Sequence, residues 1–232
     1  MSKFPEHCNV LIWYDGTEDD FNSDPLIRFA FESSRAIKIS VFKKDYSLQG
    51  NNAGEAISWP EMALASVGTF PSNYYYFVEN DYLHTEDAID SIYELFGADP
   101  TVSYISLADH RDYYHLPIHK KFTSQLYHSK NIIYRDVATT TASFAVRRAV
   151  FSEDLPLFLS AKGDFNAFTQ LTGIVGRRLI APIPARAAHC MTNLLPPAVN
   201  WDSIALLIEN QANFYNRGSM GNEVEHNLYR AT

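Results

Sequence analysis

Two acidic residues one position apart follow a strand-like stretch in the middle of the chain. The sequence there is Phe77-Val-Glu-Asn-Asp-Tyr-Leu-His84, and the run 74–78 is short and aromatic, as in a buried strand. Because alternate residues leaving a strand point the same way, Glu79 and Asp81 can face one pocket. Carboxylate oxygens suit Mg²⁺ or Mn²⁺, whose shell a ligand's phosphate oxygens would complete. The pair predicts a metal site, although such a triplet also fits a solvated loop.

The first half of the chain alternates strand-like and helix-like stretches. Strands are expected near 9–14, 37–42, 74–78 and 101–107, with helices near 24–31, 55–67 and 86–96, the last ended by Gly97. This order predicts an α/β fold with a largely parallel sheet covered by helices on both faces. Ligands bind such sheets at the carboxyl ends of the strands. Asp15, which opens a polar loop over 15–20, and the Glu79–Asp81 pair are expected at that edge.

The second half of the chain has a different pattern. A polar loop is expected over 109–130, followed by strands near 132–135 and 140–146, helices near 149–159, 165–175 and 201–214, and a Pro-rich segment at 182–197. We find no linker and no internal repeat. One domain spanning 1–232 is therefore predicted.

The composition is that of an ordinary globular protein with an acidic balance. The 232 residues are 46% hydrophobic and 20% charged, which excludes a disordered or collagen-like chain. Lys and Arg number 19 against 27 Asp and Glu, a net charge of −8, and the basic residues are scattered. Such a chain repels phosphate backbones, so nucleic acid is not expected as a partner. A phosphorylated small molecule can still bind through a bridging divalent cation.

Cysteine usage and the N-terminus bear on the compartment. Cys8 and Cys190 are too few for a disulfide framework or a cysteine-based zinc site. The N-terminus carries charged residues such as Lys3 where a signal peptide would be apolar, and the apolar run 10–14 is too short to cross a bilayer. We therefore expect a soluble, cytoplasmic protein without a transmembrane segment.

One further constellation of histidines and acids lies in the polar loop. It comprises Asp109, His110, Asp112, His115 and His119. These types could bind a metal, but their spacing fits no established site. A mobile lid or a solvated loop is the preferred interpretation.

Four stretches, in order along the chain, resemble a known enzyme family. Tyr76–His84 is similar to the family's EDDY(L)H version of the acid-x-acid metal motif, and Thr139–Val146 to its TTSTTxTF element. Gly163–Phe168 resembles a DxxxF helix start near the acceptor, and Pro182–Trp201 a PIPSLATH…LSP…DW tail. The family is that of nucleotide-sugar-dependent glycosyltransferases of the GT-A fold, particularly small family-two-like members from bacteria and viruses.

The resemblance covers about residues 9 to 204 and departs from the family at two places. Asn80 replaces the usual middle acid of the metal motif, with both flanking acids intact. Arg186 and Ala187 break the SLAT pattern of the tail, which bears on donor or acceptor binding. The resemblance implies a GT-A-like, Rossmann-related sheet, with a nucleotide-binding part over about 9–108. A second part, over about 109–216, would complete the acceptor and metal sites.

The family implies a donor sugar linked to a nucleoside diphosphate such as UDP, GDP or dTDP. Asp15 matches the position where such enzymes commonly contact the base. The loop carrying Asn51, Asn52 and Gly54 would approach the ribose and pyrophosphate, because glycine permits close backbone contact and a helix N-terminus favours anions. Taken alone, this loop also fits a plain turn between a strand and a helix.

The resemblance also assigns the metal ligands. Asp81 would bind Mn²⁺ or Mg²⁺ directly, and Glu79 would support the metal or contact the ribose. His189 is the candidate for a distal metal or diphosphate ligand, because the family tail has a histidine there. A lone histidine equally fits a packed or hydrogen-bonded core residue.

Sugar transfer with inversion requires a carboxylate that takes the proton of the acceptor hydroxyl. Asp164 is the candidate base, because it lies where the family has its acceptor-side acid. The same residue also fits a helix N-cap without a catalytic role. Retention of configuration remains an alternative.

The sequence thus predicts an enzyme, a metal-dependent glycosyltransferase that acts on a glycan, lipid-linked or protein acceptor. A nucleotidyltransferase is the first alternative, but its usual glycine-rich, lysine-containing loop is replaced by the acidic run 15–20. The second alternative is a non-catalytic module that binds a nucleotide-sugar or glycan without turnover.

Overall fold

The computed structural model describes residues 9–25, 27, 38–44, 59–69, 72–120, 125–141, 143–161, 163–191 and 195–218. For 15, 38–44, 69 and 211–218 only the backbone is described. The chain forms two compact units, one of residues 72–218 with 1–2 and one of 3–71 with 219–232. The prediction of one domain over 1–232 stays a prediction.

The smaller unit contains a parallel pair of strands, β1 (Asn9–Asp15) and β2 (Lys38–Lys44), together with α1 (Glu18–Ser23) and α3 (Trp59–Thr69). Helix α1 was not expected, since residues 15–20 were predicted to form a loop. It begins with a capping box, in which Thr17 Oγ1 accepts the Asp20 N–H at 3.2 Å and the Asp20 carboxylate accepts the Thr17 N–H at 3.3 Å. Phe21 then packs edge-to-face on Tyr14, with ring centroids 5.2 Å apart.

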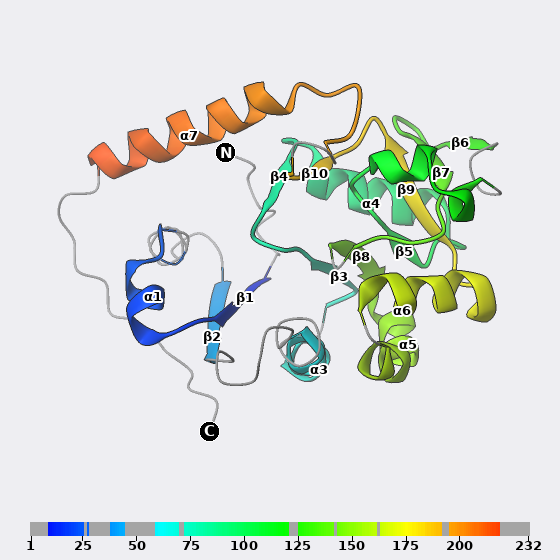
Figure 1. The fold of residues 1–232 in the computed structure, drawn as a ribbon, viewed down its shortest axis with the longest axis horizontal. Helices are drawn as coiled ribbons and strands as arrows, with labels where there is room; N and C mark the ends of the chain where they lie inside the picture. The colour runs from blue at the N-terminus through cyan, green and yellow to red at the C-terminus, as the bar shows by residue number, and fades with distance from the viewer. Residues whose placement is uncertain are drawn as a thin grey trace. The chain divides into compact units, whose positions relative to one another are not determined.

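The larger unit is built on a six-stranded sheet. Its strands are β3 (Tyr74–Phe77), β5 (Tyr104–Ile105), β6 (Leu126–His128), β7 (Ile133–Asp136), β8 (Phe144–Arg147) and β9 (Leu179–Ile183), in the order β3-β8-β5-β9-β7-β6 (Figure 1). Among these described strands only β5 and β9 pair in parallel. The sheet is therefore mostly antiparallel, and the mostly parallel sheet expected from the sequence is not confirmed.

The difference arises where β8 enters the sheet. β8 lies between β3 and β5 and is antiparallel to both, so β3 and β5 run parallel to each other without being neighbours. Helix α4 (Ala88–Ala98) joins these two strands along the chain and continues past Gly97, which was expected to end it. The carboxyl ends of β3 and β5 thus reach one edge of the sheet, as a β-α-β unit requires.

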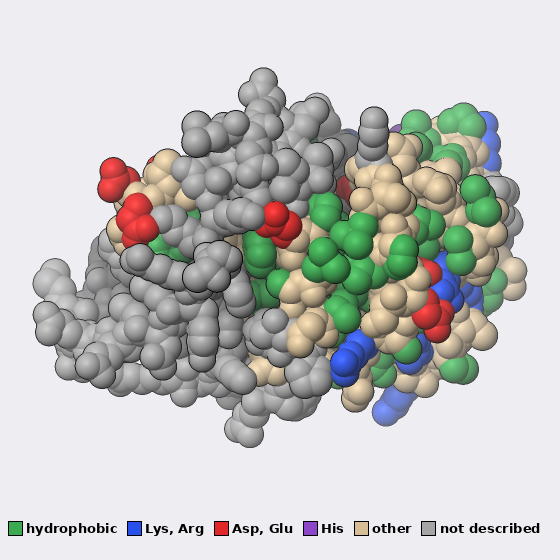
Figure 2. Space-filling view, turned by 90° about the horizontal axis from the view of Figure 1, so that it is seen from below, with side chains coloured by type: hydrophobic (Ala, Val, Ile, Leu, Met, Phe, Trp, Pro, Cys, Tyr) green, Lys and Arg blue, Asp and Glu red, His purple; other side chains and the backbone are tan. Residues whose placement is uncertain are grey.

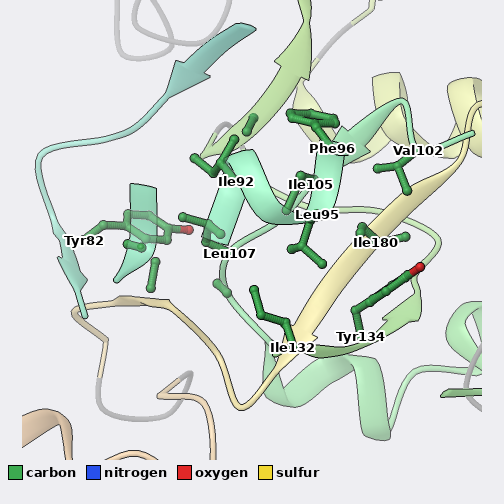
Figure 3. Close-up of a cluster of buried hydrophobic side chains, with 14 residues drawn as sticks. Tyr82, Ile92, Leu95, Phe96, Val102, Ile105, Leu107, Ile132, Tyr134 and Ile180 are labelled. Atoms are coloured by element: carbon green, nitrogen blue, oxygen red, sulfur yellow. The ribbon is translucent and has the colours of Figure 1, made fainter. Parts of the chain in front are cut away.

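Helices pack on both faces of this sheet. On one face α4 packs Ile92, Leu95 and Phe96 against sheet residues that include Ile105 and Ile180 (Figure 3). On the other face lies an aromatic cluster from α5 (Arg148–Ser160), α6 (Asp164–Gln170) and three strands. Its rings belong to Tyr75, Phe77, Tyr104, Phe144, Phe151, Phe158 and Phe168. These two cores hold the strands whose ends carry the candidate site.

The C-terminal part of this unit adds a second, two-stranded sheet. β4 (Tyr82–His84) pairs antiparallel with β10 (Ala187–His189), and α7 (Trp201–Gly218) follows. Both β9 and β10 lie within or beside the Pro-rich segment, where no strand was predicted. The Trp201 indole N–H donates to the Pro196 carbonyl at 2.9 Å and anchors the start of α7.

Some large apolar side chains remain at the surface of the described residues. Figure 2 shows hydrophobic side chains gathered on one face. The most exposed of the chain's described apolar residues include Ile174 in the turn after α6, which is 80% exposed, and Leu206 and Leu207 on α7. Leu126 in β6 and Ile133 in β7 are also exposed, so the apolar surface includes the β6–β7 edge of the sheet as well as helices.

A charged cluster fixes the loop that leads into β5. The Asp99 carboxylate accepts bonds from the Thr101 N–H at 2.9 Å, the Thr101 hydroxyl at 2.6 Å and Arg178 Nη1 at 2.5 Å. Burial raises the pKa of Asp99, but these hydrogen bonds outweigh that effect and hold the pKa at about 2. The folded state therefore favours the ionised carboxylate.

The low pKa of Asp99 makes the free energy of unfolding depend on pH in the acidic range. An unfolded aspartate titrates near 3.8, so the stabilisation is fully present above that pH and is lost as the pH falls through about 2. We expect Asp99→Asn to remove about 1 kcal/mol of stability at neutral pH and to flatten the loss between pH 4 and 2, since solvent screens part of the interaction. Urea unfolding at several pH values measures the free energy of unfolding of wild type and variant. Asp90→Asn, at an exposed position of α4, is the control, and equal acid profiles of both variants would contradict the assignment.

Candidate functional site

The turn between β3 and β4 holds the predicted acid pair. β3 ends at Phe77, and residues 78–81 form an exposed turn before Tyr82 opens β4. The backbone N–H of Glu79 donates to the Ser143 hydroxyl at 3.1 Å, and the Asp81 carbonyl accepts the Cys190 N–H at 2.7 Å. Both ends of the acid-x-acid triplet are thus tied to other segments of the chain, while the side chains stay at the surface.

Asp81 and His189 meet although 108 residues separate them in sequence. His189 Nε2 lies 2.7 Å from Asp81 Oδ2, because β10 pairs with β4 in the register that sets His189 opposite Tyr82. The Asp81 side chain is 50% exposed and the His189 side chain only 16%. His189 Nδ1 is buried and has no hydrogen-bond partner among the described residues. The two side chains for which the resemblance implied metal binding therefore form one accessible pair.

Tyr82 orients the imidazole of this pair. Its ring stacks on His189 with centroids 5.1 Å apart and an interplanar angle of 13°. Its hydroxyl lies 2.7 Å from Thr141 Oγ1, and burial raises the pKa of Tyr82 to about 12. The ring also belongs to the core cluster under α4 (Figure 3). Because a rigid core residue holds the imidazole, the pair is pre-organised.

His84 lies two residues after Tyr82 in β4 and connects this strand to β3. Its Nε2 lies 2.6 Å from the Tyr76 hydroxyl, which joins β4 to β3. Burial lowers the pKa of His84 to about 4, so this imidazole is neutral at physiological pH. His84 therefore contributes a neutral hydrogen bond between β3 and β4.

Asp164 is the first residue of α6, one position inside the helix rather than the N-cap, which is Gly163. Its Oδ1 accepts the Phe165 N–H at 2.5 Å. The sequence alternative that Asp164 is the N-cap is therefore wrong by one residue, since the N-cap is Gly163. Gly163 has a positive φ of 87°, a conformation that glycine adopts without strain.

The packing of α5 places Asp164 relative to the sheet. Since β8 is antiparallel to β3, α5 starts at the amino end of β3, directly after β8. Toward its end Phe158 stacks on Phe144, the residue paired with Phe77 at the carboxyl end of β3. The start of α6 follows after a short connection. Asp164 therefore lies toward the edge of the sheet from which Asp81 leaves.

The remaining predicted residues are not brought into this site by the described structure. Asp15 ends β1 in the smaller unit, and only its backbone is described. Asn51, Asn52 and Gly54 lie outside the described residues. Their predicted roles in binding the base, ribose and pyrophosphate stay predictions.

His110 lies toward the same edge as the pair, although its histidine-rich loop was predicted to be a mobile lid or a solvated loop. His110 follows β5, whose carboxyl end lies at the same edge as that of β3. Burial lowers the pKa of His110 to about 4; Asp112 opposes this shift, and His189 and His119 add to it through their charges. His110 is thus within electrostatic reach of His189. The density of histidines and acids over 109–119 was the available signal, but sequence alone does not show that the loop is buried.

The donor set fits a metal that takes most of its ligands from elsewhere. Among the described residues no group of three or more His, Cys, Asp or Glu side chains could hold a metal ion. Asp81 and His189 offer one carboxylate oxygen and one imidazole nitrogen. Mg²⁺ commonly keeps several waters and binds one or two carboxylates plus substrate phosphates, whereas a nitrogen ligand suits Mn²⁺ better. The pair is compatible with Mn²⁺ bound together with a diphosphate.

We expect the stacked ring of Tyr82 to matter more than its hydroxyl. Tyr82→Leu removes the ring beside His189 and should weaken Mn²⁺-dependent nucleotide binding about tenfold, as for residues that orient a metal ligand. Tyr82→Phe keeps the ring and should retain nearly full affinity, losing about 1 kcal/mol of stability with the bond to Thr141. Calorimetric titration with nucleotide and Mn²⁺ measures the affinities of both variants, and urea unfolding measures the stability. Equal affinities of the two variants would show that the stacking does not orient His189.

Comparisons with known proteins do not assign the chain to a family. No protein-family model matches the chain, and a search of curated proteins finds no match. Within the described segments, no helix combines the length and the hydropathy needed to cross a membrane.

Proposed function

We propose that the chain is a metal-dependent glycosyltransferase of the GT-A type that transfers a sugar from a nucleoside-diphosphate donor to a glycan, lipid-linked or protein acceptor. The observation that carries the proposal is the contact of Asp81 with His189 at 2.7 Å, in the turn that follows the carboxyl end of the edge strand β3. The sequence order of these two residues and their chemistry match the family pattern. The mostly antiparallel sheet does not itself argue for this fold.

The charges of the site are consistent with an anionic donor bound through a cation. The chain carries a net charge of −8, and Asp81 adds an exposed carboxylate at the site. A diphosphate would be repelled there unless a cation lay between the two anions. Asp81 and His189 would hold the divalent ion, which would supply this bridge and the positive charge that stabilises a departing diphosphate.

Asp164 is the proposed base for the acceptor. Its carboxylate would take the proton of the acceptor hydroxyl while that oxygen forms a bond to the anomeric carbon and the bond from this carbon to the diphosphate oxygen breaks. The placement of α6 toward the edge of Asp81 supports this role. A single displacement of this kind inverts the anomeric configuration.

The test is calorimetric titration of UDP-, GDP- and dTDP-sugars, each with Mn²⁺ and each with EDTA. We expect one nucleotide class to bind in the presence of metal and to lose its affinity in EDTA. Titration with Mg²⁺ in place of Mn²⁺ should give weaker binding, because His189 contributes a nitrogen. Binding that ignores EDTA, or no binding of any donor, would contradict the proposal.

A further inference from the structure

Three polar side chains form a second cluster beside the Asp81–His189 pair. They lie on two short turns after β5, η3 (Arg111–Tyr114) and η4 (Pro117–His119), and on the residue before η3. His110 is 4% exposed and His119 is fully buried, and Asp112 is half-buried. The Tyr113 ring lies between the imidazoles, with centroids 5.3 Å from His110 and 4.7 Å from His119.

The cluster is unusual because one polar atom of each of its three side chains is buried without a hydrogen-bond partner among the described residues. His110 Nε2, Asp112 Oδ1 and His119 Nε2 are all buried, and none has a hydrogen-bond partner among the described residues. A buried polar atom without a partner has lost its hydrogen bonds to water and gained none in return, so it destabilises the fold. Asp112 interacts electrostatically with both imidazoles, so the three groups share one neighbourhood. Three such atoms in one neighbourhood mark a place that a polar group of another molecule, or a buried water, could satisfy.

The protonation of the cluster can be assigned from its contacts. His119 Nδ1 accepts the Ala138 N–H at 3.4 Å, and burial lowers the pKa of His119, so its one proton resides on Nε2. The Asp112 oxygen is an acceptor. His110 is neutral, and its Nε2 donates or accepts according to its tautomer. The cluster thus offers at least one donor and one acceptor.

This combination selects the group that fits. An ammonium has no lone pair for the His119 N–H, and a phosphate has no proton for Asp112 and is repelled by it. A hydroxyl accepts from His119 and donates to Asp112 at once. Sugars present such hydroxyls, and so does water, which is the competing occupant.

We propose that His110, Asp112 and His119 form a subsite that binds a hydroxyl of the sugar on the nucleotide donor. This inference rests on the proposed function. The sugar is attached to the diphosphate, so it must lie close to the Asp81–His189 pair. β5, which leads into the cluster, ends at the same edge of the sheet as β3, and the Leu107 carbonyl after β5 accepts the N–H groups of Arg186 and Ala187 at the start of β10, so the cluster lies on the side of the pair.

The experiment compares bare nucleotides with nucleotide-sugars. UDP, GDP and dTDP and their hexose conjugates are titrated with Mn²⁺ into wild type, Asp112→Leu and the isosteric Asp112→Asn, which serves if the first variant fails to fold. We expect Asp112→Leu to lose about tenfold in affinity for the conjugate while the bare nucleotide binds as in wild type. His115→Phe, an exposed histidine of the same loop, is the matched control and should change neither.

The outcomes separate this subsite from the proposed function. Unchanged affinity of both variants for the conjugate would show that the cluster holds only water, with the glycosyltransferase proposal intact. An equal loss for nucleotide and conjugate would also overturn the subsite. Absence of metal-dependent binding by wild type would contradict the proposed function and the subsite together.

Discussion

Asp81→Ala is expected to abolish metal-dependent binding of the nucleotide donor while leaving the free energy of unfolding within about 1 kcal/mol. The Asp81 side chain is half exposed, and among the described residues it makes one side-chain hydrogen bond, to His189. Removing it should therefore change the free energy of unfolding little. It supplies the one carboxylate of the pair, and a divalent cation binds a lone imidazole weakly. Calorimetry with Mn²⁺ measures the affinity, and urea unfolding measures the stability.

A double-mutant cycle with His189→Ala makes this test sharper. If both side chains hold the same ion, the losses of affinity in the single variants are not additive, and the double variant is little worse than Asp81→Ala. Asp90→Ala, at an exposed position of α4, is the control for a change of net charge. Unchanged donor affinity in Asp81→Ala would refute the metal site.

Asp164→Asn is expected to lower the rate of sugar transfer by about 10²-fold or more without weakening donor binding, because an amide cannot take a proton from the acceptor. The substitution preserves the fold, since the asparagine oxygen can still accept the Phe165 N–H at the start of α6. Turnover of the donor identified by calorimetry is the measurement.

Asp202→Asn is the matched control for this prediction. Asp202 also lies in the first turn of a helix, α7, and is exposed. We expect it to retain wild-type turnover. Full turnover of Asp164→Asn would show that another group is the base, and a joint loss of rate and donor affinity would assign Asp164 to donor binding instead.

The sequence predicted the elements whose patterns are strong. The aromatic run of β3 and the helical spacing of α4 appear in the structure close to the expected residues. The strands β9 and β10 were missed because Pro182 and Pro184 argue locally against a strand. The direction of β8 was also missed, since a strand's sequence does not encode the direction of its neighbours.

The candidate site shows the same division. That Asp81 and His189 belong together was expected only through the family resemblance, and the β4–β10 pairing now supplies their contact. The burial of His110 and His119 was not predicted, because it depends on the packing of Tyr113 between them. The spacing of residues along the sequence does not predict these ring contacts.

The pairing of β4 with β10 also has a consequence for synthesis of the protein. The acid-x-acid turn leaves the ribosome more than a hundred residues before the strand that carries His189. An N-terminal fragment that stops before residue 187 contains Asp81 but not its imidazole partner. The pair therefore forms only after residue 189 has been synthesised, so the contact depends on the C-terminal part of the chain.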